Sequence, residues 1–324
     1  MHDVPVLRAR YIVLTCCLAG ALAGCARSGD ATSSDCAGGG DTLAVNRIGE
    51  GEGLAEVVVV DGDGEGELVT GDRVATKPSF SPDGQRLVVV EADGDYESAG
   101  PDSTSLWVIG ADGSDPRRLT DGPRDDDPAW SPDGRVIAYA GNAGGGYDAG
   151  QVMTVPVDGG SPQPLVDGDG FGDRAPSWSP DGETVAFIRI ESPAELEKST
   201  VWTVGADGSN PQPVALVPGA RKVDWHPDGK SLLVSTFAGL GRLYAVDVDS
   251  GHVQHIGDQT VLGAWAPDGE SIFFYTQEGA TRPSWWRLAE GRVVDGQVER
   301  DRFVGVVENY FHYDYLGLDV SPCA

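Results

Sequence analysis

The chain alternates between short apolar runs and polar, glycine-rich turns, and the runs are rich in β-branched and aromatic residues. Runs of this kind, a few residues long and bounded by turn residues, predict β-strands. Five of them are almost continuously apolar, at residues 87–90, 136–140, 184–188, 232–235 and 272–275. Continuous apolar strands are typical of sheets covered on both faces, so the pattern predicts an all-β fold.

A tight-turn motif, Ser-Pro-Asp-Gly, stands just before each of these strands. Three copies are complete, at residues 81–84, 131–134 and 179–182, and two variant copies begin with His226 and Ala266. Proline presets φ, aspartate suits the next position, and glycine supplies a positive φ. The motif aspartates follow one another at steps of 50, 48, 47 and 40 residues; they are Asp83, Asp133, Asp181, Asp228 and Asp268. Such a period indicates a repeat architecture.

A second hairpin follows in each period, marked by Asp-Gly or Ser-Gly between two β-rich runs. Its copies occupy residues 106–120, 152–166, 201–214 and 243–257. Two hairpins per period give four strands, which is the content of one β-propeller blade.

The two ends of the sequence supply one further blade between them. Residues 42–46 match the strand after the turn motif, but no motif precedes them, and residues 56–70 match the outer hairpin. The missing inner strand appears at 315–324, where Ser321 and Pro322 match the start of the motif and Cys323 replaces its aspartate. We therefore expect a six-bladed β-propeller, closed by the C-terminal strand joining the N-terminal blade.

Two cysteines flank this junction. Cys36 lies just before the first strand and Cys323 just after the last, so the predicted pairing brings them together at the open turn. A disulfide there would replace the missing covalent turn, as suits an exported protein. Two free buried thiols are the alternative.

The N-terminus predicts export. Arg8 and Arg10 precede an apolar run at residues 11–24, which is too short to span a bilayer. The run ends Leu-Ala-Gly-Cys, which resembles a bacterial lipobox and implies a signal peptide at 1–24 and lipidation of Cys25. Cleavage after Ala23 and an uncleaved anchor are the alternatives. Residues 25–40 are small and polar, which indicates a flexible tether, and residues 41–324 form one propeller domain.

The composition is strongly acidic, with 23 basic and 51 acidic residues and a formal net charge of −28. Such a charge argues against nucleic-acid partners and against adhesion to anionic lipid headgroups. Many of the acids are Asp-Gly turn residues, which accounts for part of the excess.

The repeats resemble a known family. The Ser-Pro-Asp-Gly copies and the outer turns beginning at Ala111 and Ala206 are similar to the TolB-type propeller repeat, across residues 41–323. The resemblance implies a six-bladed propeller used for binding. The N-terminal α/β domain of TolB has no counterpart in this sequence, so TolB's own partners are not carried over.

Propellers bind ligands at the mouth of the central channel, and charged residues just ahead of each inner strand are the candidates. The aromatic stretch 309–315 adds a recognition face, or alternatively packs the seam. The candidate ligand-binding residues are Lys77, Asp126, Asp127, Arg174, Lys222, His312 and Asp314.

A weak calcium-loop pattern lies in the first blade, with Asp61, Asp63, Glu65 and Asp72 as ligands, although a solvated hairpin turn explains the same residues. No nucleophile elbow, His-Glu-x-x-His or Cys-x-x-Cys motif occurs in the sequence.

Three functions follow from these features. The favoured one is a monomeric, membrane-anchored binding module for an envelope protein, peptide or glycan, without cofactor, on the outer face of the cytoplasmic membrane or in the cell envelope. A hydrolase or lyase with His312 beside Asp126 or Asp127, and a calcium-stabilised scaffold, are the alternatives.

Overall fold

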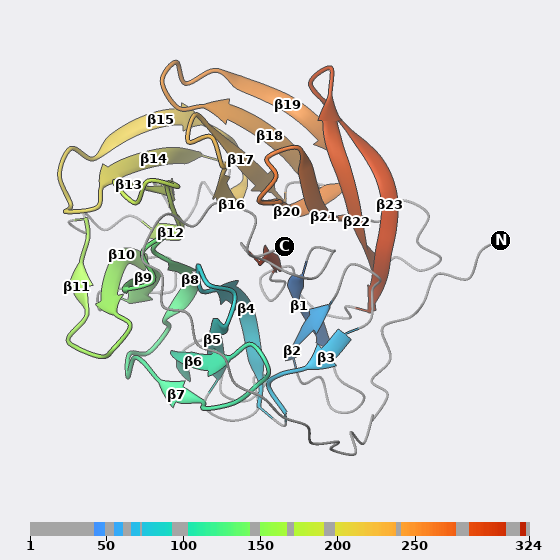
Figure 1. Ribbon diagram of the computed structural model, residues 1–324. Coiled ribbons are helices and arrows are strands. Elements are labelled where there is room, and N and C mark those ends of the chain that lie inside the picture. The colour runs from blue at the N-terminus through green and yellow to red at the C-terminus, as the bar shows by residue number, and fades with distance from the viewer. Residues whose placement is uncertain are drawn as a thin grey trace, which may run out of the picture.

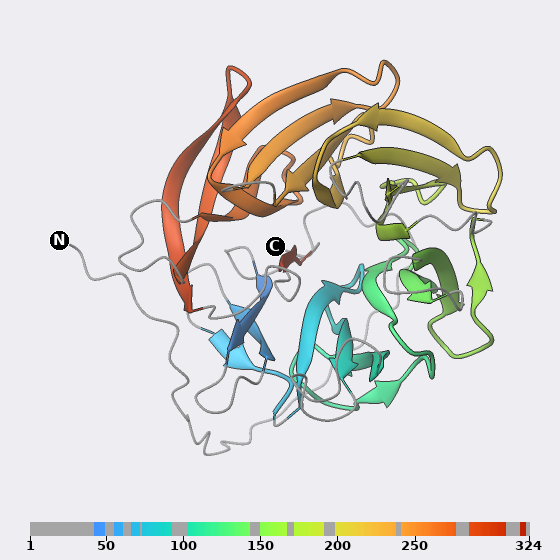
Figure 2. The same cartoon turned by 180° about the vertical axis from the view of Figure 1, so that it is seen from behind.

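The fold is a ring of sheets around a central axis (Figure 1). The computed structural model describes residues 42–48, 55–60, 66–71, 73–92, 103–142, 150–166, 172–190, 198–237, 241–276, 285–308 and 318–321. These residues form 24 strands in six four-stranded sheets, and each strand pairs antiparallel with its neighbours. The predicted six-bladed, all-β propeller is confirmed, and Figure 2 shows the same ring from behind.

The first three blades follow the order predicted from the repeats. Blade 1 contains β24 (Leu318–Val320), β1 (Leu43–Ile48), β2 (Ala55–Val60) and β3 (Gly66–Leu68). Blade 2 contains β4 (Ala75–Phe80), β5 (Arg86–Ala92), β6 (Thr104–Gly110) and β7 (Arg117–Arg118). Blade 3 contains β8 (Asp126–Trp130), β9 (Val136–Asn142), β10 (Gly150–Pro156) and β11 (Gln163–Pro164).

The other three blades have longer outer strands. Blade 4 contains β12 (Gly172–Trp178), β13 (Thr184–Ile190), β14 (Ser199–Gly205) and β15 (Gln212–Leu216). Blade 5 contains β16 (Ala220–Trp225), β17 (Ser231–Thr236), β18 (Arg242–Asp247) and β19 (Val253–Asp258). Blade 6 contains β20 (Thr260–Trp265), β21 (Ser271–Thr276), β22 (Trp285–Val294) and β23 (Gln297–Glu308).

The Ser-Pro-Asp-Gly motif forms the turn between the inner strand and the second strand of a blade. In blade 2, Ser81 Oγ donates to Asp83 Oδ1 at 2.5 Å and accepts from the backbone N–H of Arg86 at 2.9 Å. Gly84 has a φ of 66°, which explains why glycine ends the motif. The side-chain bonds close the turn and fix the register of the strand that follows.

The aromatic residue just before each motif joins neighbouring blades. Trp130 of blade 3 packs in a buried cluster with Val88 and Leu106 of blade 2. Its indole Nε1 donates to the backbone oxygen of Ser79 on β4 at 3.0 Å. Trp225 of blade 5 repeats both features against blade 4. The hydrophobic core therefore consists largely of clusters between blades.

Each of four inner strands carries a β-bulge, which the sequence did not predict. The register shifts between Thr76 and Ser79 in β4, and at the equivalent places in β8, β12 and β20. One residue in each bulge has a left-handed backbone, with φ between 48° and 50°: Lys77, Asp127, Ala175 and Leu262. A bulge turns side chains away from the regular pleat. Here it brings residues of the candidate site to the channel.

The ring closes as predicted. β24 pairs antiparallel with β1, with Val320 opposite Leu43 and Leu318 opposite Val45. The backbone N–H of Ser321 donates to Thr42 O at 2.8 Å, the same bond that Ser81 N–H makes to Arg86 O within a complete motif. Cys36 and Cys323 lie outside the described residues, so their disulfide stays a prediction.

The signal peptide at 1–24, Cys25 and the tether at 25–40 also lie outside the described residues. Within the described part of the chain, no helix has the length and apolar character needed to cross a membrane.

Candidate functional site

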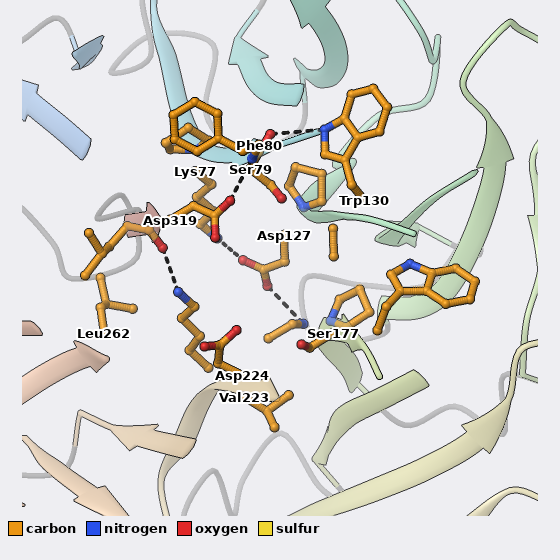
Figure 3. A pocket seen from close by; sticks show the side chains of 18 of the residues that line it. Lys77, Ser79, Phe80, Asp127, Trp130, Ser177, Val223, Asp224, Leu262 and Asp319 are labelled. Atoms are coloured by element: carbon orange, nitrogen blue, oxygen red, sulfur yellow. Dashed lines mark hydrogen bonds and ion pairs between the residues drawn. The ribbon is translucent and has the colours of Figure 1, made fainter. Parts of the chain in front are cut away.

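A cavity of about 390 Å³ occupies the central channel and is the candidate binding site (Figure 3). Its walls come from the inner strands β4, β8, β12, β16 and β24, with Leu262 of β20 completing the circle. The volume is near the lower end of the range for small-ligand pockets, about 300–1,000 Å³. Four basic residues line it, although the whole chain is strongly acidic: Lys77, Arg174, Arg221 and Lys222.

The first charged group in the channel is an ion cluster between blades 2 and 3. Lys77 Nζ lies 2.6 Å from Asp126 Oδ2 and 2.8 Å from Asp127 Oδ1. Burial of the Lys77 ammonium acts to lower its pKa, but the attraction of the two aspartates outweighs burial and raises it. Asp127 Oδ2 also accepts from the backbone N–H of Ala175 at 3.2 Å, which links blade 3 to blade 4.

The second charged group joins the C-terminal strand to the rest of the ring. Asp319 Oδ2 of β24 accepts from the backbone N–H of Phe80 at 2.6 Å. Lys222 Nζ of blade 5 reaches the backbone oxygen of Leu318 at 2.7 Å, past the intervening blade 6. Asp224 Oδ2 accepts from the backbone N–H of Trp265 at 2.8 Å. Two aspartates therefore receive backbone N–H groups of the following blade.

Both of these aspartates are costly to ionise. Burial raises the pKa of Asp224, and burial raises the pKa of Asp319 to about 6 in spite of the nearby Lys222. A carboxyl whose pKa is raised on folding binds its proton more tightly in the folded state. Its contribution to stability is therefore present below the unfolded value of 3.8 and is lost as the pH rises through about 6.

The variant Asp319→Asn removes this titration while keeping an oxygen that accepts from Phe80 N–H. We expect its melting temperature to exceed that of the unmodified protein at pH 7.5 and to show no such gain at pH 4.0. Thermal denaturation at the two pH values measures the difference. Asp181→Asn is the control, because hydrogen bonding from Ser179 lowers the pKa of Asp181 and the loss should then appear at pH 7.5. Equal shifts of Asp319→Asn at both pH values would contradict the assignment.

Arg174 differs from the other cations of the cavity. It lies near enough to Asp127 to help lower the pKa of that carboxyl, after burial and Lys77 have acted in opposite directions. Its guanidinium makes no hydrogen bond or ion pair with any other residue in the described part of the chain. The half-buried Arg174 therefore presents unused donors to the cavity.

The structure gathers part of the predicted site. Lys77, Asp127, Arg174 and Lys222 line the cavity, and Asp126 is bonded to Lys77 beside it. His312 and Asp314, and the calcium candidates Asp61, Asp63, Glu65 and Asp72, lie outside the described residues. The role of all these residues in binding stays a prediction. Across the ranges that the structure describes, no group of three or more His, Cys, Asp or Glu is placed to hold a metal ion.

The deeper layer of the channel was not predicted from the sequence. This layer, which we call the inner ring, contains the residue two positions before the first residue of each turn motif. Five of its six members line the cavity. The signal was present, because aligning the motifs places these residues at one position; they are Ser79, Ala129, Ser177, Asp224, Ala264 and Asp319.

Comparison with known proteins agrees with the propeller fold. The family model for the TolB beta propeller domain matches residues 53–195. TolB from Acinetobacter baumannii has a TM-score of 0.64 at 12% identity over 87% of this chain, which spans 66% of that protein. A putative TolB from Agrobacterium tumefaciens has a TM-score of 0.62 at 17% identity, with 88% of this chain and 99% of that chain covered.

A chain from the structure of a nidogen/laminin complex has a TM-score of 0.61 at 11% identity, with 87% of this chain and 98% of that chain covered. No curated protein matches the sequence. At such low identities the structural likenesses show the fold alone. They confirm the propeller fold, and the family model shows that residues 53–195 are similar to the TolB beta propeller domain, as the turn motifs predicted.

Proposed function

We propose that this TolB-type propeller is a membrane-anchored extracytoplasmic lipoprotein that binds a protein, peptide or glycan in its central channel. The observation that carries the proposal is the 390 Å³ cavity on the axis, in which cations and carboxylates stand beside aromatic and proline side chains. A concave site with a few convergent polar groups on apolar walls is the usual form of a binding pocket.

The anchoring part of the proposal rests on the sequence. An export signal at residues 1–24, a lipidated Cys25 and a polar tether at 25–40 would hold the propeller close to a membrane surface. The acidic surface would keep the domain away from anionic headgroups, so the lipid and not the propeller would supply the attachment.

Binding fits the described carboxylates better than catalysis does. Asp126 and Asp127 share Lys77, and Asp224 and Asp319 receive backbone N–H groups. In each of these arrangements at least one carboxylate oxygen is engaged, and the contact holds neighbouring blades together. These contacts would keep the charged side chains of the channel in fixed positions, which suits recognition of a ligand.

One experiment in bacterial cells tests both parts. A photo-crosslinking amino acid replaces Ser177, which lines the cavity, or the exposed Leu216 on the outer strand β15 as a control. We expect one discrete crosslinked product from position 177 and none from position 216. In the same cells the full chain should sediment with membranes, and Cys25→Ser should move it to the soluble fraction.

Identical crosslinking patterns from the two positions would refute the channel as the binding site. Retention of Cys25→Ser in the membrane fraction would refute lipid anchoring, independently of the crosslinking result.

A further inference from the structure

The residue just before each turn motif directs its backbone N–H toward the channel. In β12, the N–H of Ser179 bonds to Thr184 O of the neighbouring strand β13 at 2.8 Å. Successive amides of a strand point to opposite edges, so the N–H of Trp178 points to the free edge of β12, which faces the channel. The N–H groups of Phe80, Trp130 and Trp225 point the same way, because the next amide in each strand is bonded to the second strand.

The protein itself shows how a carboxylate is received at this position. Phe80 N–H donates to Asp319 of the preceding blade at 2.6 Å, and Trp265 N–H donates to Asp224 of the preceding blade at 2.8 Å. In both cases the acceptor is the inner-ring residue of the blade before. The inner ring therefore contains two built-in carboxylate sites occupied by the protein's own side chains.

The equivalent position in front of Trp178 has no side-chain acceptor. The inner-ring residue of the preceding blade is Ala129, which is half-buried, lines the cavity and has no polar side-chain atom. No side chain in the described ranges accepts from Trp178 N–H. Arg174, whose guanidinium makes no hydrogen bond or ion pair with the described residues and acts on Asp127 only at longer range, lies on the same strand and lines the same cavity. Two kinds of donor thus face the β12 side of the channel without an acceptor.

We propose that the β12 side of the channel, between the guanidinium of Arg174 and the backbone N–H of Trp178, binds the C-terminal carboxylate of a peptide chain. This inference rests on the proposed function and specifies its ligand. A guanidinium and a backbone N–H are the donors that receive carboxylates in proteins, and charge-assisted bonds of this kind are the strong ones.

The shape of the cavity favours the end of a chain over its middle. The site lies inside a ring of inner strands, which an extended chain end enters more readily than a folded loop. Pro128, Pro132 and Pro176 add apolar surface to the lining of the cavity. These surfaces suit the side chains of the last residues, and a cavity of about 390 Å³ holds only a few of them.

The test uses the full chain and a pair of synthetic peptides, acetyl-Ala-Pro-Leu with a free carboxylate and the same peptide as its C-terminal amide. Binding is followed by tryptophan fluorescence, since Trp130 and Trp178 line the cavity, and by calorimetry. We expect the acid to bind at least tenfold more tightly than the amide, because a hydrogen bond to a charged group is worth about 1.5–3 kcal/mol.

Two variants locate the site. Arg174→Met should weaken binding of the acid at least tenfold, whereas Arg135→Met, at a side chain that is 84% exposed on a turn, should leave it unchanged. Ala129→Asp should abolish binding, because it places a carboxylate in front of Trp178 just as Asp319 stands in front of Phe80. Ser161→Asp adds the same charge on an exposed turn outside the cavity and should change the Kd less than threefold. Melting temperatures show whether each variant folds. If Ala129→Asp does not fold, the binding of the acid by Arg174→Met still tests the proposed site.

Equal binding of acid and amide, absence of binding by both, or full binding by Arg174→Met would overturn the proposal. Galacturonic acid or inorganic phosphate binding as tightly as the peptide acid would also overturn it, by showing a general anion site. A crosslink from position 177 combined with equal binding of acid and amide would leave the channel as the binding site and remove only the carboxylate assignment.

Discussion

Asp173→Ala should destabilise the protein by roughly 3–5 kcal/mol, because it removes one partner of a buried, doubly hydrogen-bonded ion pair. Arg189 Nε and Nη2 each donate to the Asp173 carboxylate at 2.7 Å, and the two side chains are only 8% and 1% exposed. The Arg189 guanidinium also lies over the ring of Trp202, with 4.7 Å to the centroid. For a domain of this size the loss corresponds to a fall in melting temperature on the order of 10 °C.

The matched control is an exposed pair of the same geometry. Arg292 Nε and Nη2 contact Asp301 at 2.8 Å and 3.2 Å, but these side chains are 55% and 37% exposed. Asp301→Ala should therefore cost less than about 1 kcal/mol. The double variant Asp173→Leu/Arg189→Met, which removes both charges, should recover most of the loss. Similar melting temperatures for Asp173→Ala and Asp301→Ala would show that burial does not strengthen the pair.

The blade count followed from the sequence because each blade carries its own turn. In the three complete copies the serine hydroxyl donates to the motif aspartate and accepts the backbone N–H of the residue five positions later, so the same four residues recur where these inner strands end. The closure of the ring could also be predicted, since Ser321 and Pro322 repeat the start of that motif at the other end of the chain. Local chemistry that recurs at a constant spacing is the part of a fold that one sequence reveals most directly.

The residues that line the channel could be predicted only in part from the sequence. Charges a few residues before the turn motifs pointed to Lys77, Arg174 and Lys222, which lie four or five positions ahead of their motifs. The bulges that turn Lys77 and Asp127 toward the axis depend on a positive φ, and no glycine marks those positions. Asp224 and Asp319 were missed because their partners are backbone amides of the next blade, 41 and 239 residues away in sequence. Contacts between blades have no local signature.

Deleting residues 318–324 should abolish cooperative unfolding, because β24 supplies the inner strand of blade 1. Leu318 and Val320 are buried in one cluster with Leu43 and Val45 of β1 and Tyr275 of blade 6. Loss of two buried aliphatic side chains costs about 2–5 kcal/mol each, which is comparable to the whole stability of a typical protein, about 5–15 kcal/mol. Asp319 and the backbone oxygen of Leu318, which tie β24 to blades 2 and 5, are lost as well.

A circular permutant separates the role of the strand from that of the chain ends. Ser321 N–H bonds to Thr42 O as Ser81 N–H bonds to Arg86 O, so a Pro-Asp-Gly-Gln link from Ser321 to Thr42 would complete a sixth motif turn. A chain that begins at residue 318, continues through this link and ends within blade 6 should unfold cooperatively, at a temperature no lower than that of the natural order. Since the permutant lacks Cys36 and Cys323, its melting temperature should not change when a reductant is added.

A deletion variant that still melts in one sharp transition, or a permutant that does not, would show that the strand does not close the ring. Calorimetry of both chains, with Cys323→Ala in the natural order as the control for the thiol, distinguishes these outcomes.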